Sequence, residues 1–329
     1  MNITKNRIFV IIFTVALFSY SLVFASEYSI IDTHLHYLDF TQSTDGFSSL
    51  IEKMDEANVS HAVIFGMPMA KQWDEHAPNE PAYYLSNDSR AYYFSATDFF
   101  MMQALLQQPE EVQDRFFPFV GGINPNDKNA ARYIQQVLDL YPGRFYGIGE
   151  LMSRHDDLTA LTYGEPPRAD HPALLKVYDL AAELNMPVLL HHNITGVYMS
   201  EVLYLDEMKR ALSHNRNANI IWAHVGISRR IEIPNLLEIT DNMLAENDNL
   251  FFDISWVVFE DYIVPNITDW AALMNRYPDR FMIGSDKVAR WETYPQEITK
   301  YYQLVDLLHP ETQRKVTSEN ILRLIGVGK

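Results

Sequence analysis

Short apolar segments alternate with longer helical patterns along the whole chain after residue 26, and this alternation is what most constrains the fold. The apolar segments are rich in β-branched and aromatic residues, as expected for parallel strands that are buried on both faces. We expect strands at 28–34, 61–66, 117–122, 145–150, 187–191, 219–224, 250–255 and 280–286. Helical patterns such as 47–57, 129–140, 172–184 and 236–246 lie between them.

Strands joined by helical crossovers, with no break in the alternation, predict an α/β fold: one (β/α)8 TIM barrel that forms a single domain over 26–329. An open doubly wound sheet is the alternative, but it would need a glycine-rich phosphate-binding fingerprint that the sequence lacks. The connection after the second strand is much longer than a βα loop needs. We therefore expect an insert at about 70–116. Its aromatic residues would form either a lid over the site or a small packed subdomain.

The first 25 residues have a character of their own. Lys5 and Arg7 precede an apolar stretch at 8–17, and the small residue Ala25 follows Val23 and Phe24. This pattern predicts a secretory signal peptide over 1–25 and a secreted or periplasmic protein, with no stable membrane insertion after cleavage. A retained N-terminal membrane anchor is the alternative, because the apolar run approaches spanning length.

The composition restricts the possible metal ligands and the possible binding partners. The 329 residues include 26 Lys and Arg against 43 Asp and Glu, and this formal charge of −17 argues against a nucleic-acid partner. The chain has no cysteine, so any bound metal must be held by His, Asp or Glu. We expect the partner to be a small-molecule substrate.

Histidines and carboxylates recur where the expected strands end. His34 and His36 share one face of the first strand, because side chains alternate along a strand. Further strands end with Glu150, His191, His224 and Asp286. Any one of these would more often be a hydrogen-bonded rim residue. Their recurrence at the carboxyl ends of five strands predicts one site at the mouth of the barrel.

Several segments, in this order, resemble the amidohydrolase superfamily: D-T-H-L-H, P-V-L-L-H, I-I-W-A-H-V-G and I-G-S-D. The likeness is to its amidohydrolase-related branch, which includes aminocarboxymuconate-semialdehyde decarboxylase, aromatic-acid decarboxylases and lactone hydrolases. It covers essentially all of 26–329. The resemblance implies a TIM-barrel enzyme that depends on a divalent metal.

Carried over to this chain, the resemblance implies that His34, His36, His191 and Asp286 bind the metal and that His224 lies beside it. The segment that ends in Glu150 is similar to the strand-4 glutamate that bridges two metals in the deoxyribonuclease-like branch, so Glu150 is a further candidate ligand. We therefore expect one divalent cation, with a second possible, and Zn²⁺ suits these ligands best.

This donor set implies a mechanism. A cation with open positions activates water, Asp286 can move the proton, and His224 can polarise a carbonyl group. The sequence therefore predicts an exported hydrolase of an ester, lactone or amide bond. One alternative is a metal-dependent non-oxidative decarboxylase of a small carboxylic acid, but the decarboxylases of this branch look cytoplasmic. The other alternative is a non-catalytic exported barrel that binds a metal or ligand.

Basic residues follow the ends of three strands, and they predict that the pocket prefers an acidic substrate. Guanidinium and ammonium groups there could bind a substrate carboxylate, which would make the substrate a small organic acid. Ordinary ion pairs with loop acids are the alternative. Lys287 directly follows Asp286, where relatives often carry an aromatic residue, so the pocket is expected to differ from theirs. The candidates are Arg154, Arg229, Arg230 and Lys287.

Two further acids are expected to support the fold rather than the chemistry. Asp32 should face away from the mouth and pair with the backbone. Asp253 ends the seventh strand, where we expect a structural role.

Overall fold

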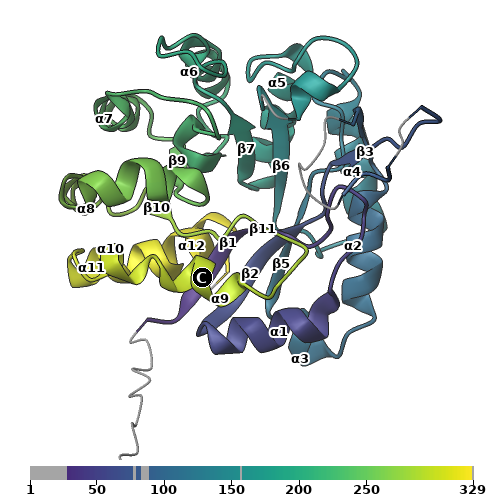
Figure 1. Cartoon of the computed structure of the whole chain (residues 1–329), viewed down its shortest axis with the longest axis horizontal. Coiled ribbons are helices and arrows are strands. Elements are labelled where there is room, and N and C mark those ends of the chain that lie inside the picture. The colour runs from purple at the N-terminus through teal and green to yellow at the C-terminus, as the bar shows by residue number, and fades with distance from the viewer. Residues whose placement is uncertain (1–27, 77–78, 83–88, 156–157, 328–329) are drawn as a thin grey trace, which may run out of the picture.

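A computed structural model describes residues 28–76, 79–82, 89–155 and 158–327 (Figure 1). Its main sheet has nine parallel strands in the order β10-β9-β8-β7-β6-β5-β2-β1-β11. The edge strands β10 and β11 belong to one segment, in which the Ile283 carbonyl accepts a hydrogen bond from the Thr33 amide at 3.0 Å. This segment joins β9 to β1 and closes the sheet. The fold is therefore the predicted α/β barrel.

The strands occupy the segments that the sequence indicated, with ends shifted by a few residues. The first strand begins two residues later than expected and includes both His34 and His36. The strands are β1 (Ile30–His36), β2 (Val59–Phe65), β5 (Phe116–Val120), β6 (Gly147–Ser153), β7 (Val188–His192), β8 (Ile220–Trp222), β9 (Leu250–Asp253), β10 (Phe281–Met282) and β11 (Lys287–Val288).

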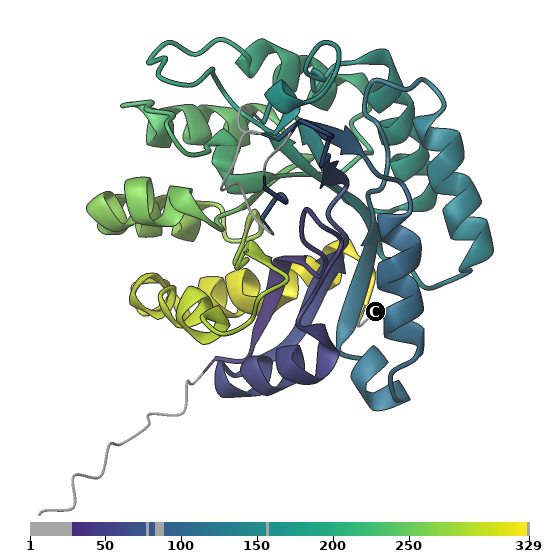
Figure 2. The ribbon, with the colours of Figure 1, turned by 45° about the vertical axis from the view of Figure 1, so that its right-hand side comes forward.

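The helices form the outer layer around the strands, and the C-terminal helices lie beside β1 (Figure 2). Capping residues define where some of these helices begin and end. Helix α5, for example, starts at Pro172, where the His171 side chain accepts the Ala173 amide at 3.2 Å, and it ends at Asn185 in the left-handed conformation. The helices are α1 (Gly46–Glu56), α2 (Thr97–Leu106), α3 (Glu110–Gln113), α4 (Ala130–Leu140), α5 (Pro172–Leu184), α6 (Leu205–His214), α7 (Leu236–Glu246), α8 (Ile267–Arg276), α9 (Tyr294–Thr299), α10 (Tyr302–Val305), α11 (Pro310–Arg314) and α12 (Asn320–Leu324).

Two apolar layers hold the barrel together. A large cluster packs the helices on the outside of the strands. A smaller cluster includes Ile31, Val63, Phe119, Leu189 and Ile221. Because these residues come from strands on different sides of the barrel, the smaller cluster fills its interior. This packed interior supports the side chains above it at the carboxyl ends of the strands.

The connection between β2 and β5 contains more than a crossover helix. It forms an antiparallel pair of short strands, β3 (Met69–Lys71) and β4 (Ala91–Tyr93), before α2 and α3. Just before β4, the Arg90 guanidinium lies 5.6 Å from the centroid of the Tyr163 ring, so this hairpin contacts the connection that follows β6.

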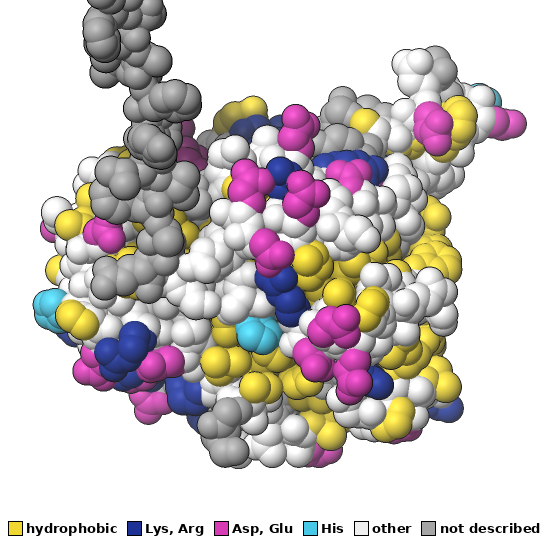
Figure 3. Space-filling model, turned by 90° about the horizontal axis from the view of Figure 1, so that it is seen from below, with side chains coloured by type: hydrophobic (Ala, Val, Ile, Leu, Met, Phe, Trp, Pro, Cys, Tyr) yellow, Lys and Arg dark blue, Asp and Glu magenta, His cyan; other side chains and the backbone are white. Residues whose placement is uncertain are grey.

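The predicted signal peptide at 1–25 lies outside the described residues. Among the helices that the structure describes, none is long and apolar enough to cross a membrane. On the face shown in Figure 3, Lys and Arg side chains are dispersed among Asp and Glu rather than gathered into one area.

Candidate metal centre

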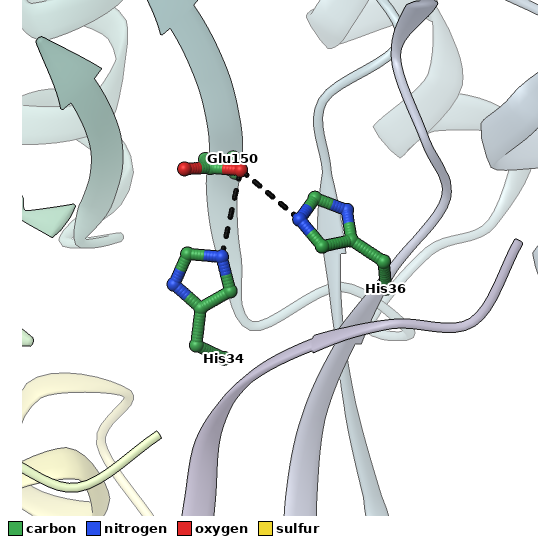
Figure 4. Close-up of side chains that lie close together, drawn as sticks. All are labelled: His34, His36 and Glu150. Atoms are coloured by element: carbon green, nitrogen blue, oxygen red, sulfur yellow. Dashed lines mark ion pairs between the residues drawn. The ribbon is translucent and has the colours of Figure 1, made fainter. Parts of the chain in front are cut away.

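The carboxyl ends of the strands bring the predicted histidines and carboxylates together at the mouth of the barrel. These side chains are buried except that of Asp286, which is 11% exposed. Figure 4 shows His34 and His36 on β1 pointing toward Glu150 on β6. The other members are His191 on β7, His224 in the turn after β8, and Asp286 between β10 and β11.

One group of donor atoms comes from two histidines and two carboxylates that lie close together at the carboxyl end of β1. The Nε2 atoms of His34 and His36 lie 3.5 and 3.2 Å from Glu150 Oε2. The same two nitrogens lie 3.2 and 3.3 Å from Asp286 Oδ1. Two imidazole nitrogens and two carboxylate oxygens therefore converge, which is a donor set that divalent cations accept.

A second group of donors uses the other oxygen of Glu150. Its Oε1 atom lies 3.1 Å from His191 Nδ1 and 3.8 Å from His224 Nε2. The candidate ligand atoms of Glu150, His191 and His224 all lie within 4.8 Å of one another, as do those of His34, His36 and Glu150. Glu150 thus stands between two groups, each of which could hold a cation.

Hydrogen bonds on the far side of the ring orient His34 and His191. His34 Nδ1 donates to Asp253 Oδ2 at 2.6 Å, which leaves the Nε2 lone pair facing the centre. That buried Nε2 atom has no hydrogen-bond partner among the residues that the structure describes. His191 Nε2 lies 3.0 Å from Asn193 Oδ1, so its Nδ1 lone pair faces Glu150. When these rings are neutral, such bonds leave the inward nitrogen of each one free to bind a metal.

Ser255 connects His224 to Asp253, the residue that also binds His34. His224 Nδ1 lies 2.9 Å from Ser255 Oγ and 3.2 Å from the Ser255 carbonyl oxygen. Ser255 in turn donates its hydroxyl to Asp253 Oδ2 at 2.7 Å and its amide to Asp253 Oδ1 at 2.8 Å. The structural role expected for Asp253 is therefore the support of two histidines at the centre.

Asp32 holds the turn that carries Asp286. As expected, it pairs with the backbone, accepting the amides of His34 at 3.0 Å and Ser285 at 2.8 Å. Asp286 itself has a φ of 50° and donates its amide to the His34 carbonyl at 2.8 Å. These bonds fix the Asp286 carboxylate against the two histidines of β1.

The buried environment sets the charge of the side chains. Burial lowers the pKa of His224 to about 4, so this ring is neutral. Burial alone would raise the pKa values of Glu150 and Asp286, but the positive charge of the adjacent His34 and the contacts with the other histidines outweigh it and hold both below their usual range. Burial would lower the pKa of His34, but Glu150, Asp286 and Asp253 outweigh it and hold that pKa well above its usual value, so a metal bound there would replace the proton on His34. The carboxylates are therefore charged and available to a cation.

The centre opens into a small cavity. Apolar side chains line much of it, and His155 lines it beside the candidate ligands. The His155 ring stacks on His191, with centroids 4.2 Å apart. The sequence indicated only that His155 follows a strand end, a position it shares with the other members of the site. The apolar lining residues are Phe40, Met67, Met152, Leu158, Trp256 and Val288.

The four candidate substrate-binding cations take different positions. Arg154 binds Glu207, with Nε–Oε2 and Nη2–Oε1 distances of 3.1 and 2.7 Å, and it does not line the cavity. Arg230 lies over the ring of Tyr198, 5.9 Å from its centroid. Arg229 lies 5.8 Å from the centroid of the ring of Trp256, a residue that lines the cavity. Lys287 lines an adjacent cavity beside Asp286.

A family model described as amidohydrolase matches residues 31–327. No curated protein matches the chain.

Solved structures share the fold at low sequence identity. A TIM-barrel protein from Bordetella bronchiseptica is 16% identical, with a TM-score of 0.58 and coverage of 90% of this chain and 98% of that one. A probable 2-pyrone-4,6-dicarboxylic acid hydrolase from Acinetobacter baumannii is also 16% identical, with a TM-score of 0.57 and coverage of 91% and 100%. The 2,6-dihydroxybenzoate decarboxylase from Rhizobium is 12% identical, with a TM-score of 0.57 and coverage of 91% and 98%.

Proposed function

The chain belongs to the amidohydrolase family, and from this premise we propose that it is a metal-dependent hydrolase of an ester, lactone or amide bond in a small organic acid. One observation carries the proposal. The Nε2 atoms of His34 and His36 converge with Glu150 Oε2 and Asp286 Oδ1 at distances of 3.2–3.5 Å, where the centre opens into a cavity. Polar donors that meet at the base of a largely apolar cavity are typical of an active site.

His34, His36, Glu150 and Asp286 would hold one divalent cation, and Glu150 with His191 and His224 could hold a second. Nitrogen and oxygen ligands of this kind suit Zn²⁺. A bound divalent cation supplies Lewis-acid chemistry, which lowers the pKa of a bound water to about 7.

Asp286 is the group placed to move the proton. Its Oδ1 atom faces the histidines of β1, whereas Oδ2 lies 3.9 Å from His224 Nε2. We propose that Oδ2 accepts the proton of the water that attacks the carbonyl carbon. The same oxygen then delivers that proton to the leaving oxygen or nitrogen as the bond from carbon breaks. The products are a carboxylic acid and an alcohol or amine, or a hydroxy acid from a lactone.

His224 is oriented as an acceptor. Because its Nδ1 atom donates to Ser255, its Nε2 lone pair faces Glu150 and Asp286. We propose that His224 binds the second cation where two are present.

Non-oxidative decarboxylation is the second candidate, since a decarboxylase is among the structures with this fold. The same ligands would orient a substrate carboxylate. We favour hydrolysis on the export that the sequence of residues 1–25 predicts.

The test begins with protein stripped of metal by a chelator and reloaded with Zn²⁺. We expect turnover of part of a panel of esters, lactones and amides only after reloading. Asp286→Asn should reduce kcat at least about 100-fold while Zn²⁺ remains bound, because it removes the proton acceptor. Asp269→Asn, an exposed change on α8, serves as the matched control. Release of CO₂ from aromatic carboxylates without any hydrolysis would overturn the proposal in favour of decarboxylation, and Zn²⁺ binding without turnover would support a binding barrel.

A further inference from the structure

A second cavity adjoins the one above the metal centre. We call the cavity above the metal centre the inner cavity. The outer cavity is larger, and it is also lined by Ser285, Lys287, Arg290 and Glu297. Trp256, Asp286 and Val288 line both. A substrate whose reacting bond lies at Asp286 can therefore extend into both cavities.

The inner cavity suits a short apolar group. Its walls away from the candidate ligands are His155 and apolar side chains, among them the buried Phe40, Met67, Met152 and Leu158. The apolar part of these walls favours hydrocarbon over charge, since a charged group against it would lose its hydration without a compensating partner. The inner cavity is the smaller of the two, so the group that it admits is short.

Charged side chains of both signs line the outer cavity, Asp286 and Glu297 beside Lys287 and Arg290. Arg290 Nη2 lies 2.7 Å from Asp39 Oδ2, and Glu297 Oε2 lies 2.9 Å from Lys300 Nζ, so both of these lining residues are in ion pairs. Lys287 donates its ammonium group to the hydroxyl of Thr293. Within the described part of the chain, Lys287 forms no ion pair with a carboxylate.

Resting on the proposed hydrolase function, we propose that the substrate joins a short apolar acyl group to a leaving group that bears one negative charge. The acyl group occupies the inner cavity, and Lys287 binds the anion in the outer cavity. A charge-assisted hydrogen bond from an ammonium group is stronger than one between neutral groups, so it selects the anion. The formal charge of −17 disfavours anions over most of the surface, which makes this local positive group selective.

Three esters test where the charge belongs. Phenyl acetate is neutral, 4-acetoxybenzoate carries its carboxylate on the leaving group, and monophenyl succinate carries it on the acyl group. We expect kcat/KM, divided by the rate of alkaline hydrolysis of each ester, to be at least about tenfold higher for 4-acetoxybenzoate than for the other two. Lys287→Gln should reduce that preference to near unity.

Lys209→Gln is the matched control. Lys209 lies on α6 and pairs with Glu246 at 3.4 Å, and it lines neither cavity. The preference should be the same in this variant as in the wild type. Equal corrected rates for the three esters, a preference for monophenyl succinate, or an undiminished preference in Lys287→Gln would each overturn the inference.

A binding measurement separates this inference from the proposed hydrolase. Titration calorimetry of the Zn²⁺-loaded protein should show 4-hydroxybenzoate binding at least about tenfold more tightly than phenol, with the difference lost in Lys287→Gln. If this pattern appears although no ester is hydrolysed, the anion assignment stands and the hydrolase proposal fails. If neither compound binds, or both bind equally, the anion assignment is wrong whatever the turnover.

Discussion

The Nδ1 atom of His34 lies 2.6 Å from Oδ2 of Asp253, and both side chains are fully buried. This bond fixes the tautomer of His34 and turns its Nε2 lone pair toward the centre. A carboxylate in this position also makes the imidazole a stronger base and hence a better ligand. Because Asp253 also binds Ser255, which contacts His224, one carboxylate orients histidines from two strands.

Asp253→Asn should weaken metal binding without removing a ligand. The amide can offer a hydrogen-bond donor where His34 needs an acceptor, so the ring loses its preferred tautomer. We expect a loss of about 10- to 100-fold in Zn²⁺ affinity, measured by competition with a chromophoric chelator. Asp269→Asn, exposed on α8, should bind Zn²⁺ as the wild type does. An unchanged affinity in Asp253→Asn would show that Asp253 only supports the fold.

Glu150→Gln should reduce the amount of metal that the protein retains. The substitution removes the charge that faces both donor groups but keeps the shape of the side chain. We expect the Zn²⁺ content per chain after dialysis, measured by elemental analysis, to fall by at least half, and the rise in Tm on adding Zn²⁺ to shrink. Glu183→Gln, exposed on α5, is the control. Wild-type metal content in Glu150→Gln would remove Glu150 from the ligand set.

The sequence predicted the barrel and the gathering of His34, His36, Glu150 and Asp286, because both follow from local periodicity. The carboxyl ends of the strands in a parallel barrel meet at one face, so a residue at such an end lies near the mouth of the barrel. The hydrogen-bond partner of each side chain is harder to predict, because it can come from a distant part of the sequence. The Asp253–His34 contact joins residues 219 positions apart, and no spacing rule indicates it.

The partners of the basic residues were also not predictable from the sequence. Arg154 follows a strand end, as predicted, but its guanidinium turns to Glu207 on α6. That choice depends on a positive φ of 44° at Arg154 and on how α6 packs, which are properties of the folded chain. His155, the next residue, lies in the cavity instead. Adjacent residues in a loop can thus take opposite directions that strand alternation does not predict.

The Arg154–Glu207 pair should contribute measurably to stability. Its two hydrogen bonds are charge-assisted, and the side chains are only 20% and 10% exposed. A double-mutant cycle with Arg154→Gln, Glu207→Gln and the double variant should give a coupling free energy of about 1 to 3 kcal/mol in urea unfolding. The pair Lys209–Glu246, more exposed at 42% and 59%, should give less than about 0.5 kcal/mol. Equal coupling in the two pairs would contradict the expected effect of burial.

Asp98 should make the stability of the protein depend on pH. Its carboxylate on α2 is buried and accepts the amides of Gly121 at 3.1 Å and Gly122 at 2.8 Å. Burial outweighs these bonds and raises its pKa to about 6, from 3.8 in the unfolded chain. The folded state therefore binds this proton more tightly. The stabilisation is complete below about pH 4 and is lost as the pH rises through 6.

Asp98→Asn isolates this effect, because the amide resembles the protonated acid and does not titrate. The free energy of unfolding of the wild type, minus that of Asp98→Asn, should fall by about 2 to 3 kcal/mol between pH 4 and pH 7.5 in urea titrations. Other titrating groups are common to both proteins and cancel in the difference. Any loss of a hydrogen bond in the variant shifts the difference equally at every pH. A difference that stays constant over this range would mean that Asp98 keeps its ordinary pKa in the folded protein, and that its two amide partners compensate fully for burial.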